Sequence, residues 1–150
     1  TFLVQDKDNF SINKKNIKII SEKAPTNREI DDLIFANKVV KHVRSNAIVI
    51  AKNKTTIGIG SGNTSRVDSV KFAIEKSKRV QSTNTTKTLN GAVMASDAFF
   101  PFTDSIELAS KVGIKSIIQP GGSIKDKSVI EEINKTGISM VFTNKRCFSH

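Results

Sequence analysis

The final sixty residues alternate short apolar runs with amphipathic stretches, and this alternation limits the fold more than any other feature of the chain. Three apolar runs have the length of strands: Ala92–Ala95, Ile114–Gln119 and Ile138–Phe142. Two helical stretches lie between them, each opened by an aspartate and closed by a glycine: Asp104 to Gly113 and Asp126 to Gly137. A β-α-β-α-β order requires parallel strands joined by right-handed crossovers. The pattern therefore predicts an α/β fold with a mostly parallel sheet.

The first ninety residues add elements of both kinds. Thr26 and Glu29 have the spacing of a capping box, which predicts a helix from Thr26 to about Arg44. Ser65, followed three residues later by Asp68, predicts a second helix. We expect strands or extended segments at Phe2–Gln5, Ile17–Ile20, Asn46–Lys52 and Thr55–Ile59, and a loop at Gln81–Asn90. The Asn46–Lys52 run is nearly continuously apolar, which is typical of a strand buried on both faces.

Length and composition exclude several classes of protein. A chain of 150 residues is long enough for one domain with a buried core, and its 37% hydrophobic content argues against a disordered chain. No apolar run approaches the roughly 18 residues of a membrane-spanning helix, so we expect no membrane partner. The one cysteine, Cys147, cannot form an internal disulfide, which indicates a reducing compartment. The chain starts at Thr1, and we expect it to be a piece of a longer polypeptide or a processed chain.

The charge leaves two interpretations open. Lys and Arg number 24 against 14 Asp and Glu, which gives a net charge of +10 and suits an anionic partner such as nucleic acid or phosphate. However, 19 of these basic residues are lysines, and lysine, isoleucine and asparagine together are what AT-rich codons encode. The basic residues are also scattered, with no run of five. A basic RNA- or polyanion-binding α/β module without catalysis is therefore the alternative hypothesis, and nucleic acid is the less favoured partner.

Three segments that follow the last three strands form the candidate site. Ligands of open parallel sheets bind beyond the carboxyl ends of the strands, so we expect these loops to meet at one edge: Ser96–Asp104, Pro120–Ile124 and Thr143–His150. They hold an aromatic cluster, two acids, a Gly-Gly turn, an arginine and a histidine. Structural roles remain open for each, namely an apolar plug, a helix cap, a tight turn and a solvated cation. The residues alone predict a rim for a phosphorylated ligand.

Two other motifs carry little functional information. Gly58-x-Gly60-x-Gly62 before a helix is a weak match to a phosphate-binding loop, because it lacks the Rossmann spacing and a Lys-Ser/Thr pair. One cysteine and two histidines far apart in the sequence lack the spacing of zinc ligands, so we expect no metal site. The same absence disfavours a zinc deaminase.

Five motifs in order resemble one known family. They are SNAIVIAK at 45–52, IGIGSG at 57–62 with SRVDS at 65–69, ASDAFFPF at 95–102, IQPGGSI at 118–124, and the terminal segment from Gly137 to His150. Together they resemble the carboxyl-terminal part of the bifunctional purine biosynthesis family that combines AICAR transformylase with IMP cyclohydrolase. The resemblance covers essentially the whole chain.

The resemblance implies a fold, an activity and partners. It implies a three-layer α/β/α fold of the cytidine-deaminase-like type, with residues 1–150 forming the second half of the transformylase region. The implied enzyme is a formyltransferase that moves a formyl group from 10-formyltetrahydrofolate, its co-substrate, to the amine of AICAR in purine (IMP) biosynthesis, without a metal. The parent protein would also be an IMP cyclohydrolase, cytosolic (cytoplasmic), and a homodimer with sites at the subunit interface.

The resemblance also assigns residues. The positions matched to AICAR contacts are Asn46, Arg66, Phe99 and Arg146. The positions matched to the folate are Val67, Asp104, Ser123 and Ile124. His150 matches a terminal histidine with a supporting catalytic role, whereas the family's main catalytic Lys-His pair lies upstream of this chain. Thr103 stands where an arginine is usual, which would weaken an ionic contact at the folate. The cyclohydrolase domain is also absent, and without the upstream Lys-His pair we expect the chain alone to be inactive.

Overall fold

The computed structural model describes residues 13–81 and 89–144. The expected segment Phe2–Gln5, most of the loop Gln81–Asn90, and the predicted site residues Arg146 and His150 lie outside the described residues. Among the residues described, no helix is both long enough and apolar enough to cross a membrane.

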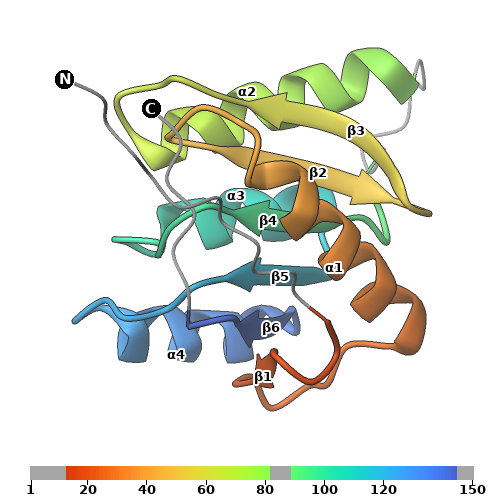
Figure 1. The fold of residues 1–150 in the computed structure, drawn as a ribbon. Helices are drawn as coiled ribbons and strands as arrows, with labels where there is room; N and C mark the ends of the chain where they lie inside the picture. The colour runs from red at the N-terminus through yellow and green to blue at the C-terminus, as the bar shows by residue number, and fades with distance from the viewer. Residues whose placement is uncertain (1–12, 82–88, 145–150) are drawn as a thin grey trace, which may run out of the picture.

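A six-stranded mixed sheet forms the centre of the fold (Figure 1). The strands are β1 (Lys18–Ile19), β2 (Ile48–Lys52), β3 (Thr55–Gly60), β4 (Val93–Ser96), β5 (Ser116–Gln119) and β6 (Ser139–Phe142), in the order β1-β6-β5-β4-β2-β3. β4, β5 and β6 are parallel neighbours, as the β-α-β-α-β pattern predicts. β2 is antiparallel to both β3 and β4, and β1 is antiparallel to β6. Four strands, β3 to β6, therefore run in one direction, which confirms the mostly parallel prediction for a sheet that is nevertheless mixed.

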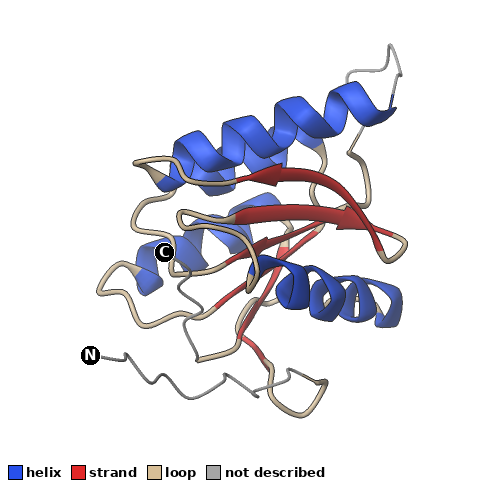
Figure 2. Ribbon diagram, turned by 45° about the horizontal axis from the view of Figure 1, so that its top comes forward, coloured by secondary structure: helices blue, strands red, loops and turns tan. Residues whose placement is uncertain are grey.

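Helices cover both faces of this sheet (Figures 1 and 2). α1 (Asn27–Val40) packs on one face with small and β-branched residues of the central strands. α2 (Arg66–Gln81), α3 (Asp104–Val112) and α4 (Asp126–Thr136) pack on the other. The three-layer α/β/α prediction is thus confirmed.

The sequence of β2 shows why a strand in this position must be apolar throughout. Ile48 and Ile50 point to the core shared with α2, α3 and α4, while Val49 and Ala51 point to the core under α1. All four side chains are fully buried. Because successive side chains of a strand point to opposite faces, a strand covered on both sides needs a continuous apolar run.

Local capping marks the starts of α1 and α2 and the ends of α3 and α4. Thr26 and Glu29 form the predicted capping box: the Glu29 N–H donates to Thr26 Oγ1 (3.2 Å) and the Thr26 N–H donates to Glu29 Oε1 (3.0 Å). Ser65 accepts from the Asp68 N–H (3.2 Å), which confirms the second cap. α3 and α4 end at glycines in the left-handed conformation, as expected.

Two helix boundaries differ from the prediction. α1 ends at Val40 rather than near Arg44, because the N–H groups of His42 and Val43 bond three residues back and the chain turns there. Asp104 is the first residue of α3 and not its cap, which is Thr103. The Asp104 carboxylate instead accepts from the neighbouring Ser105 N–H (2.8 Å).

The Gly58-x-Gly60 pair lies within β3 and faces α2. A Cβ atom on Gly60 would lie 1.9 Å from the Ser69 carbonyl oxygen, and one on Gly58 would lie 2.2 Å from the Ala73 carbonyl oxygen. These glycines therefore allow the α2 backbone to pack directly on the strand. The phosphate-loop interpretation is wrong for both positions, since they belong to a strand packed against a helix.

Candidate functional site

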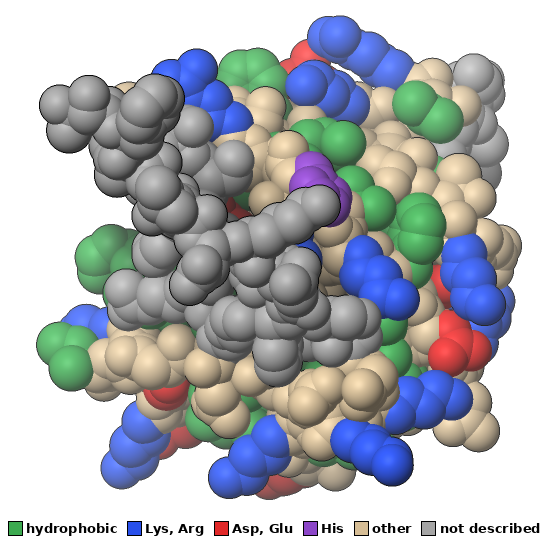
Figure 3. Space-filling view, viewed as in Figure 1, with side chains coloured by type: hydrophobic (Ala, Val, Ile, Leu, Met, Phe, Trp, Pro, Cys, Tyr) green, Lys and Arg blue, Asp and Glu red, His purple; other side chains and the backbone are tan. Residues whose placement is uncertain are grey.

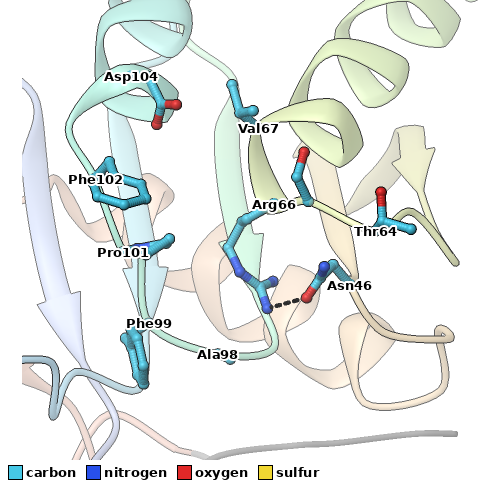
Figure 4. Close-up of a pocket in the computed structure, with 10 residues that line it drawn as sticks. Asn46, Thr64, Arg66, Val67, Ala98, Phe99, Pro101, Phe102 and Asp104 are labelled. Atoms are coloured by element: carbon cyan, nitrogen blue, oxygen red, sulfur yellow. Dashed lines mark hydrogen bonds between the residues drawn. The ribbon is translucent and has the colours of Figure 1, made fainter.

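A pocket of about 480 Å³ opens at the edge of the sheet where β3 and β4 end (Figure 4). It lies between the segment that joins β3 to α2 and the segment that joins β4 to α3, and Asn46 contributes from just before β2. Its lining residues are Asn46, Thr64, Ser65, Arg66, Val67, Ala98, Phe99, Pro101, Phe102 and Asp104. The polar side chains come mainly from the α2 side and the apolar ones from the β4–α3 loop. One wall can therefore donate and accept hydrogen bonds while the other offers a flat apolar surface.

Arg66 forms the centre of the polar wall. Its Nη2 donates to Asn46 Oδ1 (2.8 Å), the contact drawn in Figure 4, and its Nη1 donates to Ser96 Oγ (3.0 Å). Nη1 also forms an ion pair with the Asp97 carboxylate. Arg66 is only 7% exposed, so this ion pair is shielded from solvent. The guanidinium is held in one orientation by partners on two segments of the chain, the residues just before β2 and those at the end of β4.

Asn46 is held through both its side chain and its backbone. Its amide Nδ2 donates to the Asn63 carbonyl oxygen (3.0 Å), and its own carbonyl accepts from Ser69 Oγ (2.7 Å). The Asn63 amide in turn donates to Ser69 Oγ (3.1 Å). These bonds join the start of β2, the loop before α2 and the first turn of α2 into one rigid unit.

The three phenylalanines of the β4–α3 loop have different roles. Phe100 is fully buried in the core, which confirms the apolar-plug interpretation for this residue. Phe99 and Phe102 line the pocket, and Phe102 is 62% exposed. The loop is held by Gln119, whose buried side-chain oxygen accepts from the Phe100 N–H (3.1 Å). The buried ring of Phe100 thus anchors the loop, while the rings of Phe99 and Phe102 line the pocket.

The structure brings together five of the nine predicted site residues: Asn46, Arg66, Val67, Phe99 and Asp104 all line this pocket. Ser123 and Ile124 lie in the loop between β5 and α4 and do not line it, and the Ile124 side chain is 97% exposed. Among the described residues, the loops after β5 and β6 are joined where the Asn144 N–H donates to the Pro120 carbonyl (2.9 Å), and the Ser96–Asp104 loop contacts the end of β5 through Gln119. The hollow itself, however, lies between the β3–α2 and β4–α3 segments.

Sequence reasoning missed two residues of the pocket lining, Thr64 and Ser65, which lie outside the expected loops. Ala98, Pro101 and Phe102 also line the pocket and belong to the expected Ser96–Asp104 segment, although no individual role was predicted for them. Asp97 and Gln119 lie behind the lining and hold it, and each directly follows or ends an apolar strand. In the sequence, the signal for both was a polar residue at the carboxyl end of an apolar run.

Metal binding by this part of the chain has no support from the geometry. Within residues 13–81 and 89–144, no group of three or more His, Cys, Asp or Glu side chains is placed to hold a metal ion. Because His150 and Cys147 lie outside those ranges, metal-free chemistry stays a prediction.

The fold places the chain in a structural class. A dCMP deaminase from the cyanophage S-TIM5, solved in complex with dCMP and dUMP, superimposes with a TM-score of 0.51 over 77% of this chain and 98% of that one, at 13% identity. At this identity the likeness concerns the fold alone, and it agrees with the cytidine-deaminase-like α/β/α prediction.

Sequence comparison then gives the family. The model of the AICARFT/IMPCHase bienzyme family matches residues 1–76. The bifunctional purine biosynthesis protein PurH of Persephonella marina is 53% identical over 148 residues, and that of Caldicellulosiruptor saccharolyticus is 55% identical over 148. Each alignment covers 99% of this chain and 27% of the relative. The chain therefore belongs to the AICARFT/IMPCHase bienzyme family of purine biosynthesis enzymes, as the motifs indicated, and spans about a quarter of the length of these relatives.

Proposed function

We propose that the protein carrying this chain transfers a formyl group from 10-formyltetrahydrofolate to the amine of AICAR, and that residues 1–150 form the second half of its transformylase region. The observation that carries the proposal is the shared pocket. Three residues matched to AICAR and two matched to the folate, which lie as far apart as 46 and 104 in the sequence, line the same hollow. In the parent protein the cyclohydrolase reaction belongs to a region outside this chain.

The polar wall suits the uncharged part of the nucleotide. Asp97 already compensates the Arg66 charge, so the Arg66–Asn46 pair offers hydrogen bonds more than net attraction for an anion. A carboxamide or ring nitrogen matches such a wall, because it both donates and accepts. The nucleotide phosphate is left to Arg146 in this proposal, whose planar fork suits it.

The opposite wall suits planar rings. Phe99, Pro101 and Phe102 offer apolar surface beside the polar wall. The exposed carboxylate of Asp104 lies on the same side of the pocket and can accept from the N–H groups of a pterin-type ring (Figure 4). We therefore assign the end of the pocket near Val67 and Asp104 to the folate, with Ser123 and Ile124 reaching it only from the neighbouring loop.

The chemistry proposed here is orientation of a poor nucleophile. The AICAR amine is conjugated with its ring, and its nitrogen must approach the formyl carbon along a defined line. The amine nitrogen of AICAR forms a bond to the formyl carbon, and the bond between that carbon and folate N10 breaks. The amine loses one proton and N10 gains one, so the step balances. This chain supplies positioning, and His150 a supporting role. Proton transfer by the family's Lys-His pair, and completion of the site by a second subunit in the cytosol, remain part of the proposal.

Asp104 provides the sharpest test of the proposal. In the intact protein, Asp104→Asn should raise the KM for 10-formyltetrahydrofolate roughly ten-fold while the KM for AICAR stays unchanged, because a charge-assisted hydrogen bond is lost. The control is Glu107→Gln, which neutralises the other acid of the first turn of α3 outside the pocket lining. Steady-state formyl transfer with each substrate varied would measure both constants. Equal effects of the two variants would refute the folate assignment, and an inactive wild-type protein would refute the function.

The rival hypothesis, a basic module that binds RNA, rests on the net charge of +10. Lys and Arg side chains are dispersed around the face seen in Figure 3 and do not gather into one stripe. The pocket lining contains one cation, Arg66, and that cation is already paired. These observations favour a small ligand over a polyanion.

A further inference from the structure

Asp97 is a buried acid outside the pocket lining whose contacts all lead to the pocket. It follows the last residue of β4 and is 1% exposed. Its Oδ2 accepts from Ser45 Oγ, and its Oδ1 accepts from the Ala47 N–H (3.2 Å) and from Arg66. Its own N–H donates to the Ala47 carbonyl (3.2 Å). The carboxylate is thus held by the residues on either side of Asn46 and by Asn46's partner, Arg66.

The energetic role of this carboxylate follows from the burial of Arg66. A guanidinium removed from water without a counter-charge is strongly unfavourable, and in the described part of the chain Asp97 is the acid that pairs with it. Removing the negative charge would leave the cation uncompensated. The guanidinium would then be free to turn toward solvent through the pocket that it lines.

The geometry around Arg66 shows what is being positioned. Nη1 is occupied by Asp97, Ser96 and the Ala47 carbonyl, and Nη2 makes one bond to Asn46. Of the five N–H groups of an arginine, Nε–H and one Nη2–H have no partner among residues 13–81 and 89–144 and are the ones that can serve a ligand. Which two remain is decided by the partners on Nη1, chiefly Asp97.

We infer that Asp97 is a positioning residue for the AICAR side of the pocket: it compensates the charge of Arg66 and fixes the direction in which Arg66 and Asn46 present their hydrogen bonds. The inference rests on the proposed function for the identity of the ligand. It predicts that loss of the Asp97 charge weakens AICAR binding without a comparable effect on the folate.

The first experiment separates binding from turnover in the intact protein. Asp97→Asn preserves shape and removes the charge, and we expect the KM for AICAR to rise about ten-fold, the KM for the folate to change less than about two-fold, and kcat to change little. The matched control is Asp32→Asn. Asp32 is equally buried and accepts from two backbone N–H groups, those of Asn53 (3.1 Å) and Lys54 (2.9 Å), but it does not contact the pocket residues. A similar rise in the AICAR KM in both variants, or an unchanged KM in Asp97→Asn, would overturn the inference.

The second experiment does not depend on the reaction. An arginine-selective dicarbonyl reagent, followed by mass spectrometry of the peptide that holds residue 66, reports how tightly Arg66 is held. We expect Asp97→Asn to speed the labelling of Arg66 about ten-fold and Asp32→Asn to leave it unchanged. If wild-type protein transfers no formyl group, the proposed function fails, and the labelling rates still decide the role of Asp97. Unchanged labelling in Asp97→Asn would overturn the inference whatever the activity.

A milder variant covers the case in which Asp97→Asn does not fold. Ser45→Ala removes one donor to the Asp97 carboxylate and keeps the ion pair. We expect a smaller change in the same direction in both measurements, and no change in either would contradict the inference.

Discussion

At the residue scale, glycine controls how closely helix and strand approach each other. A Cβ on Gly60 would meet the Ser69 backbone at 1.9 Å, a contact that no side-chain movement can relieve. At Gly122 the situation is reversed, because nothing lies within 4 Å but φ is +96°, where side chains are strained. One glycine is required for space and the other for conformation.

This difference can be measured on the free energy of unfolding. We expect Gly60→Ala to lower it by about 3 kcal/mol or more, because α2 must move away from β3, and Gly122→Ala to lower it by about 1–2 kcal/mol. Urea unfolding of both variants of the intact protein would measure the two costs. A Gly60→Ala variant as stable as Gly122→Ala would contradict the close packing of α2 on β3.

At the element scale, two threonines precede helices in different ways. Thr26 caps α1 through its side chain, whereas Thr103 precedes α3 in a helical conformation and makes no side-chain cap hydrogen bond. The same residue type therefore stabilises one helix start directly and leaves the other to the Asp104 carboxylate. The sequence motif S/T-x-x-E distinguishes them, because Thr26 is followed three residues later by Glu29, whereas Thr103 is followed at that spacing by Ile106.

The caps give a prediction with its own control. Thr26→Ala should lower the free energy of unfolding by about 1 kcal/mol, because the Glu29 N–H loses its acceptor. Thr103→Ala should change it by less than about 0.5 kcal/mol, as expected for a position without a cap bond. Thermal unfolding of the two variants would compare them, and equal losses would show that α1 does not depend on the capping box.

At the scale of the whole molecule, the two cores differ in the size of their side chains. The core under α1 contains Ala36, Ala47, Ala51 and Ala95 beside valines, while the opposite core is built largely from isoleucine, methionine and phenylalanine. Small residues on α1 and on the strands allow that helix to lie close to the centre of the sheet. Ala95 of β4, which faces α1, should therefore tolerate added volume less well than its neighbour Met94, which faces the opposite core.

Adjacent substitutions in β4 test this difference. Ala95→Leu should lower the free energy of unfolding by about 3 kcal/mol, because it adds volume between α1 and the sheet. Met94→Leu on the opposite face conserves volume and should lower it by less than about 1.5 kcal/mol. Both are fully buried, so burial does not distinguish them, and similar losses would argue against the close packing of α1.

The sequence by itself determined the elements and the family. Periodicity and caps depend on neighbours in the chain, so the parallel β4-β5-β6 unit, the starts of α1 and α2 and the glycine ends of α3 and α4 were all predictable. The motifs around Asn46, Arg66 and Phe99 predicted the family from local sequence alone, and the match to the AICARFT/IMPCHase family model confirmed it.

Only the tertiary structure decided which of these residues share a hollow. The antiparallel insertion of β2 beside β4 brings Asn46 next to Arg66, and Arg66 to Asp97, across separations of 20 and 31 residues. Packing of β3 on α2 assigned Gly58 and Gly60 to the core, and the path of the β5–α4 loop left Ser123 and Ile124 outside the pocket. The physical reason is that local hydrogen bonding fixes elements, whereas buried charge pairs and close backbone contacts form only when distant segments pack together.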